Sequence, residues 1–84
     1  MNKKVLEHVE TEKLLMEVEY EIIKATVKAR QKNNLSQRDL SAITKIAQPA
    51  IANIEKRKNS PQINTLLKIL TPLGFTLKVV PIKK

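Results

Sequence analysis

Apolar residues recur at helical spacing along four stretches of the chain, and residues that start or stop helices flank each stretch. The first stretch runs from about Thr11 to the segment QKNN, where Asn33 or Asn34 suits the left-handed conformation that often ends a helix. We expect one long helix here, with Thr11 as its N-cap and with first turns that project beyond a small core. Its apolar positions are Leu14, Leu15, Val18, Ile22, Ala25 and Ala29.

Two short helices are predicted next, joined by a turn of three or four residues. Ser36 is placed to cap the first of them, with Asp39 in its first turn, beside the positive end of the helix dipole. The segment KIAQPAIANIE then holds a proline within a helical pattern, and a proline inside a helix costs about 3 kcal/mol or more. Pro49 has no intrahelical hydrogen bond to lose if it lies in the first turn. We therefore expect the second helix to span residues 48–56.

The last helix is predicted to have Ser60 as its cap, to open at Pro61 and to stop at Gly74. The segment FTLKVV after it alternates in the manner of a strand, which Pro81 ends. A lone strand is not stable, and the rest of the chain offers no partner strand. A second copy of the chain is the simplest source, so we predict a dimerisation strand that carries Phe75, Leu77 and Val79.

Charge divides the chain into two parts. Residues 1–21 hold three lysines against six glutamates, a net charge of −3, whereas residues 22–84 hold thirteen Lys and Arg against only Asp39 and Glu55, a net charge of +11. This contrast indicates two partners of opposite character, with a nucleic acid for the basic part. Because Tyr20 and Phe75 are the only aromatic residues, stacking of single-stranded bases is disfavoured and duplex DNA is favoured.

The two short helices and their connecting turn describe a helix-turn-helix, with apolar positions at Leu40, Ile43, Ile46, Ile51 and Ile54. Its second helix would place its N-terminal side chains at base edges in the major groove, where amides pair with adenine and small apolar groups contact thymine methyls. The predicted base contacts are Gln48, Pro49, Ala52 and Asn53. The predicted phosphate contacts are Gln37, Arg38, Lys45, Lys56, Arg57, Lys58 and Asn59. For the charge run at 56–58, a merely solvated surface is the competing interpretation.

Residues 35–61 resemble the Cro/C1-type (XRE) helix-turn-helix family, whose usual form is close to LTQEELAERTGISQSAISRIENGKRNP. The matching positions are Leu35, Gln37, Leu40, Thr44, Ile46, Gln48, Ala50, Ile51, Ile54, Glu55 and Pro61. The resemblance implies a mainly α, lambda-repressor-like bundle of about five helices that reads operator half-sites as a dimer. Three positions depart from the family pattern: Lys45 and Arg57 replace glycines, and Ser41 replaces a small alanine.

The wider layout, from the long first helix to LGFTLKVV, is similar to HigA-type antitoxins. This resemblance implies a homodimer that binds its own operator and also occupies a RelE-like (HigB-type) toxin that cleaves mRNA. We expect residues 1–20 to bind the partner, residues 21–74 to bind DNA and residues 75–81 to join two copies. The predicted toxin contacts are Leu14, Leu15, Val18, Glu17 and Glu21, although a solvated helix extension explains the acidic segment equally well.

Other classes of protein find little support in the sequence. It has no cysteine, no Gly-rich phosphate loop and one histidine, His8, so we expect neither an enzyme nor a metal site nor a cofactor. No apolar run approaches the length of a membrane span and the start lacks a signal-peptide pattern, so we expect a cytoplasmic protein without membrane contact. The alternatives that stay open are a stand-alone repressor and a module that binds only proteins.

Overall fold

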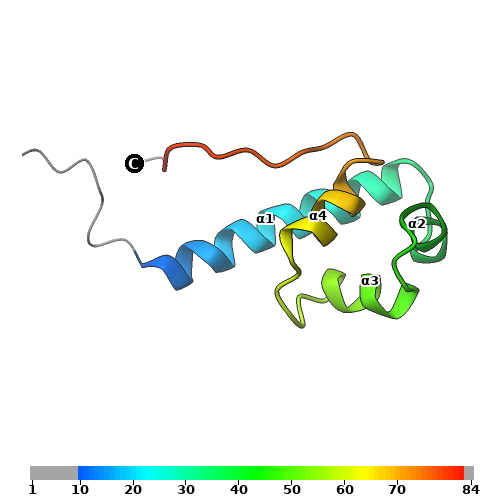
Figure 1. Cartoon of the computed structure of the whole chain (residues 1–84), viewed down its shortest axis with the longest axis horizontal. Helices are drawn as coiled ribbons and strands as arrows, with labels where there is room; N and C mark the ends of the chain where they lie inside the picture. Colours follow the sequence, from blue (N-terminus) through cyan, green and yellow to red (C-terminus); the bar gives the residue numbers. More distant parts are fainter. Residues whose placement is uncertain (1–9, 83–84) are drawn as a thin grey trace, which may run out of the picture.

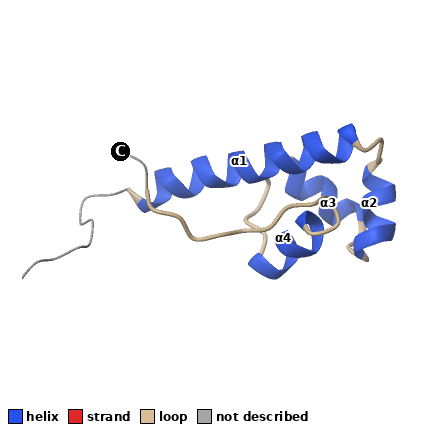
Figure 2. Ribbon diagram, turned by 90° about the horizontal axis from the view of Figure 1, so that it is seen from above, coloured by secondary structure: helices blue, strands red, loops and turns tan. Residues whose placement is uncertain are grey.

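The computed structural model describes residues 10–82 and contains four helices within that range (Figure 1). They are α1 (Thr11–Lys32), α2 (Gln37–Thr44), α3 (Gln48–Glu55) and α4 (Ile63–Leu70). Helices α2, α3 and α4 gather around the C-terminal half of the long helix α1, whose first turns extend past them (Figure 1). The segment after α4 runs back beside α1 toward its N-terminal end (Figures 1 and 2). The predicted mainly helical bundle is therefore confirmed, with four helices within residues 10–82 where about five were expected.

The core lies between the C-terminal half of α1 and the three short helices. Its buried residues come from all four helices and are Ile23, Leu40, Ile51, Ile54 and Ile69, with Val27, Ile46 and Leu73 packed against them. The buried residues of α1 begin only at Ile23, so its first three turns contribute none to the core. The apolar pattern continues through both halves of α1, but only the C-terminal half is covered by the other helices and buried.

The ends of α1 differ from the prediction at one end and agree at the other. The N-cap is Glu10, which is extended, and Thr11 is already helical, so the prediction of Thr11 as the cap was wrong. At the C-terminal end Asn34 takes the left-handed conformation with a φ of 58°. The N–H groups of Asn34 and Leu35 donate to the carbonyls of Gln31 and Arg30, at 3.0 Å each. These bonds satisfy carbonyls that a helix end otherwise leaves unpaired.

Helix α4 is shorter than the sequence predicted, because it begins later and ends earlier. Gln62 is its N-cap, with an extended backbone, so Ser60 and Pro61 precede the helix rather than start it. The helix ends at Leu70, and a turn over residues 71–74 carries the chain to Gly74. Gly74 has a φ of 90°, a conformation that favours glycine and that turns the chain back along α1.

The short C-terminal strand that was predicted to pair with a second copy is not seen in the single chain. Residues 75–82 form no strand with any other described residue. A strand is defined by hydrogen bonds to a neighbouring strand, and the other described segments are helices and turns. Leu77 is half-buried, whereas Val79 is fully exposed. The segment does alternate in sequence, but it can form a strand only beside a partner strand, which the single chain lacks.

No helix in the described part of the chain is long and apolar enough to cross a membrane. Among residues 10–82 no group of His, Cys, Asp or Glu side chains is arranged to hold a metal ion. His8 lies outside the described residues.

Candidate nucleic-acid interface

The turn between α2 and α3 is built from a strained residue and two side-chain hydrogen bonds. Lys45 is left-handed, with a φ of 65° and a ψ of 19°, and its N–H donates to the carbonyl of Ser41 at 2.8 Å. The hydroxyl of Ser41 donates to the carbonyl of Ile46 at 2.5 Å, and the N–H of Ile46 donates to the hydroxyl of Thr44 at 3.2 Å. Lysine at this position costs about 1–2 kcal/mol relative to a relaxed conformation. The Ser41 hydroxyl thus links the two ends of the turn. Serine at this position, where the family has alanine, supplies a hydrogen bond that alanine cannot make.

A capping box starts α2. The N–H of Asp39 donates to the hydroxyl of Ser36, and the N–H of Ser36 donates to the carboxylate of Asp39, both at 2.9 Å. This confirms the predicted role of Ser36. The exchange satisfies two donors that a helix N-terminus otherwise leaves unpaired and fixes the direction in which α2 enters the bundle.

The capping box makes folding stability depend on pH. The hydrogen bond from the Ser36 backbone, aided by the Ser36 hydroxyl and by Arg38, holds the pKa of Asp39 below its ordinary value. A carboxyl group with a lowered folded-state pKa stabilises the fold above its unfolded-state pKa, and this contribution is lost as pH falls through the folded-state pKa. We expect the Asp39→Asn variant to lack this pH-dependent contribution to folding stability. Urea unfolding of both proteins across the acidic range tests this, and parallel pH profiles would contradict it.

Helix α3 begins at Gln48 and holds Pro49 in its first turn, as the sequence predicted. Its apolar side is buried through Ile51 and Ile54. The predicted base contacts lie away from that side: Gln48, Pro49 and Asn53 are exposed and Ala52 is half-buried. The structure therefore leaves these four side chains on a face that is open to a partner.

A polar chain of four residues runs beneath this face and links three helices. Arg30 of α1 donates from Nε and Nη2 to the two carboxylate oxygens of Glu55, at 2.8 and 3.0 Å. The amide of Gln37 donates to the same carboxylate at 2.9 Å and accepts a hydrogen bond from the amide of Gln48 at 3.2 Å. Arg30 also donates to the carbonyl of Leu35 at 2.8 Å. These hydrogen bonds orient the side chain of Gln48. Through Gln37 they also link Gln48, at the start of α3, to Glu55 at its end.

Arg30 and Glu55 were absent from the predicted functional residues. Their side chains are only 11% and 9% exposed, so the pair belongs to the interior and not to the solvated surface. One signal was available in the sequence, because Glu55 is one of only two acidic residues between positions 22 and 84. Gln37, a predicted phosphate contact, is half-buried, and its amide is held by this network. Its role toward DNA stays a prediction.

The remaining predicted phosphate contacts are exposed. They are Arg38, Lys45, Lys56, Arg57, Lys58 and Asn59. Arg57 is left-handed with a φ of 57° and lies just beyond α3, where its guanidinium carbon is 5.0 Å from the centre of the Tyr20 ring. Arg57 thus contacts α1, and nothing in the sequence indicated this contact.

The predicted toxin contacts lie on the first turns of α1. Leu15 is 48% and Val18 is 40% exposed, Glu17 and Glu21 are exposed, and Leu14 is half-buried. Exposed apolar side chains between acidic ones are typical of a surface that a partner covers.

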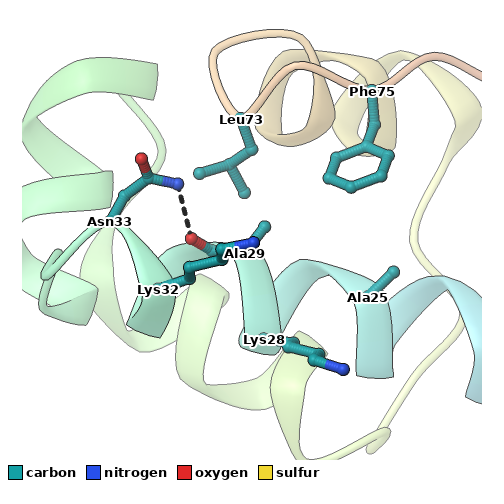
Figure 3. A pocket seen from close by; sticks show the side chains of 7 residues that line it. All are labelled: Ala25, Lys28, Ala29, Lys32, Asn33, Leu73 and Phe75. Carbon is teal, nitrogen blue, oxygen red and sulfur yellow. Dashed lines mark hydrogen bonds between the residues drawn. The ribbon is translucent and has the colours of Figure 1, made fainter.

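An apolar groove lies on another part of the molecule (Figure 3). It has a volume of about 530 Å³, and Ala25 and Ala29 of α1 face Leu73 and Phe75 across it. Lys28, Lys32 and Asn33 also line it, and Asn33 donates to the carbonyl of Ala29 at 2.7 Å. No residue of α2 or α3 contributes to this groove, so it is separate from the candidate nucleic-acid interface.

Comparison with known proteins defines the class. A family model described as helix-turn-helix matches residues 28–80, and the chain belongs to this Cro/C1-type family of DNA-binding transcription regulators. The chain is 45% identical over 62 residues to an uncharacterized HTH-type transcriptional regulator of Haemophilus influenzae. That match covers 74% of this chain and spans 63% of the length of the relative.

A solved structure shares the fold more completely. The chain resembles a chain of a toxin-antitoxin module from Streptococcus pneumoniae with a TM-score of 0.73 and 37% sequence identity. The match covers 89% of this chain and 84% of that one. The likeness therefore extends beyond the helix-turn-helix to most of the chain.

Proposed function

We propose that this protein is a DNA-binding antitoxin that neutralises a RelE/HigB-like, mRNA-cleaving toxin and represses its own operon through α2 and α3. The observation that carries the proposal is the first half of α1. It lies outside the core, combines exposed Leu15 and Val18 with several glutamates, and takes no part in the helix-turn-helix. A DNA-binding domain alone has no use for such a surface, whereas a basic toxin complements it.

The DNA surface of the proposal consists of α3 and the residues around it. The exposed amides of Gln48 and Asn53 have the chemistry to pair with adenine, and Pro49 and Ala52 offer contacts for thymine methyls. The cations before and after α3 contact phosphates of the flanking backbone. The support for this surface is the orientation of Gln48 by the buried Arg30–Glu55 pair through Gln37.

A homodimer completes the proposal. Operators recognised by helix-turn-helix proteins hold two half-sites about 34–36 Å apart, which two copies of the chain would read. The N–H of Phe75 donates to the carbonyl of Leu70 at 2.9 Å, but residues 76–82 form no backbone hydrogen bond with another described backbone group and are open to pairing. Phe75 and Val79 are exposed in the same segment. A second copy would supply the partner strand that one chain lacks.

Replacing Gln48 with alanine is expected to weaken binding to the operator by about 1–3 kcal/mol and to relax the preference at one base position. The loss arises because a paired amide contact to one base disappears while phosphate contacts stay. Binding of the parent and the variant to a set of single-base operator variants measures both effects. If the variant kept the affinity and base preference of the parent, the placement of α3 in the groove would be wrong.

The alternative is a stand-alone repressor, and the likeness to a transcriptional regulator favours it. A growth assay distinguishes an antitoxin from a stand-alone repressor. The protein of the adjacent reading frame is induced from one promoter and this chain from another, with no shared operator. The proposal predicts growth arrest by the neighbour alone and recovery when this chain is present. Arrest without recovery, or a harmless neighbour, would favour the stand-alone repressor.

A further inference from the structure

Tyr20 is a residue to which neither the helix-turn-helix nor the proposed toxin surface assigns a role. It lies on α1 one turn before the first core residue of that helix, and its ring is half exposed. The guanidinium carbon of Arg57 is 5.0 Å from its centre, and the ammonium of Lys24 is 5.7 Å away. Both distances fall within the range in which a cation is attracted to an aromatic face. Two cationic side chains thus lie near the same aromatic ring, beside the end of α3.

The backbone brings Arg57 to this ring at some cost. Arg57 has a φ of 57°, a conformation suited to glycine. The N–H groups of Arg57 and Lys58 donate to the carbonyls of Ile54 and Asn53, at 2.9 and 3.0 Å, and close the end of α3. These bonds fix the direction in which the Arg57 side chain leaves the backbone. The contact with Tyr20 then limits where its guanidinium can lie.

The guanidinium keeps its hydrogen-bonding capacity in this arrangement. A guanidinium that stacks on a ring uses its flat face, and its N–H groups point outward from its edge. The ion pair formed between two described residues is that of Arg30 and Glu55, so no carboxylate within residues 10–82 neutralises Arg57. A guanidinium that no carboxylate of residues 10–82 neutralises, beside a recognition helix, is a ready site for a phosphate.

We propose that Tyr20 is a positioning residue, which holds the guanidinium of Arg57 for contact with a phosphate of the DNA backbone next to the end of α3. The inference rests on the proposed DNA-binding function. Tyr20 itself touches no DNA, and its effect passes through Arg57. Without the ring, the Arg57 side chain must be ordered at the moment of binding, which lowers the affinity.

The test is a double-mutant cycle on operator affinity with the full chain. Tyr20→Ala is expected to bind about two- to fivefold more weakly, the range of an exposed cation–π contact. Tyr20→Phe keeps the ring face and should bind like the parent. In the Arg57→Gly background, Tyr20→Ala should lose most of its effect, because the cation that the ring holds is gone.

Arg57→Gly also separates binding from folding. Glycine suits the φ of 57°, so the Tm of this variant is not expected to fall, whereas the slope of log affinity against log salt should decrease by about 0.9 for one phosphate. Lys78→Gln removes an exposed charge far along the chain from α3 and is expected to leave the slope unchanged.

Three results would overturn the inference: tighter binding by Tyr20→Ala, binding equal to that of the parent, or an undiminished effect in the Arg57→Gly background. Each of these presupposes that the parent binds the duplex. If the parent bound no duplex at all, the proposed function itself would fail instead.

Discussion

Replacing Glu55 with alanine is expected to destabilise the folded chain by about 3 kcal/mol. The carboxylate accepts hydrogen bonds from Arg30 and Gln37, and both members of the ion pair are about nine-tenths buried. Removal of one partner of a buried pair leaves the other charge without compensation, which costs about 3–5 kcal/mol, and the slight exposure here favours the lower end. Operator affinity should fall as well, by about 1 kcal/mol, because Gln37 would no longer be anchored beneath Gln48.

Urea unfolding of the parent and the Glu55→Ala variant measures the first effect. Glu21→Ala is the matched control, since it removes the same charge from an exposed position on α1 and should change stability by less than about 0.5 kcal/mol. If the two variants were equally stable, the Arg30–Glu55 pair would not join α1 to α3 in solution.

The double replacement of Leu15 and Val18 with alanine is expected to weaken binding of the toxin by at least about tenfold. The two side chains are 48% and 40% exposed and lie on the same side of α1. Apolar residues at the centre of an interface each contribute about 1 kcal/mol or more, so their joint loss is expected to dominate the affinity. Stability should change little, because neither side chain belongs to the core.

Calorimetric titration of the toxin into each variant measures this effect. Met16→Ala is the control, because Met16 is 68% exposed and is turned about 100° around the helix from Leu15. Binding of the operator by the double variant should equal that of the parent. A toxin affinity unchanged by the double replacement, or equally reduced by Met16→Ala, would remove this face of α1 from the proposed contact.

Local patterns in the sequence predicted the elements that depend on neighbouring residues. Pro49 indicated where α3 starts because a proline is tolerated only in the first turn of a helix. Ser36 indicated the start of α2 as an N-cap, and Asp39 did so as an acidic residue in the first turn. The structure adds the reciprocal hydrogen bonds between them. Lys45, which stands where the family has glycine, takes the left-handed conformation that glycine favours.

Contacts between residues that are far apart in the sequence could not be predicted from these local patterns. The Arg30–Glu55 pair joins residues 25 positions apart, and nothing near either residue in the sequence indicates the other. The same holds for Tyr20 and Arg57, which meet only because α3 packs against α1. The C-terminal strand is not seen in the single chain for a related reason. A strand needs a neighbouring strand, and the alternating pattern describes only the segment itself.

The most direct test of the central claim is co-purification with the neighbouring gene product. This chain is expressed together with the protein of the adjacent reading frame, and only the neighbour carries a tag. The account predicts that the two elute together and that the complex shifts a fragment of their shared promoter. If the neighbour eluted alone while this chain still shifted the promoter, the protein would be a repressor without a toxin, and the antitoxin proposal would be contradicted.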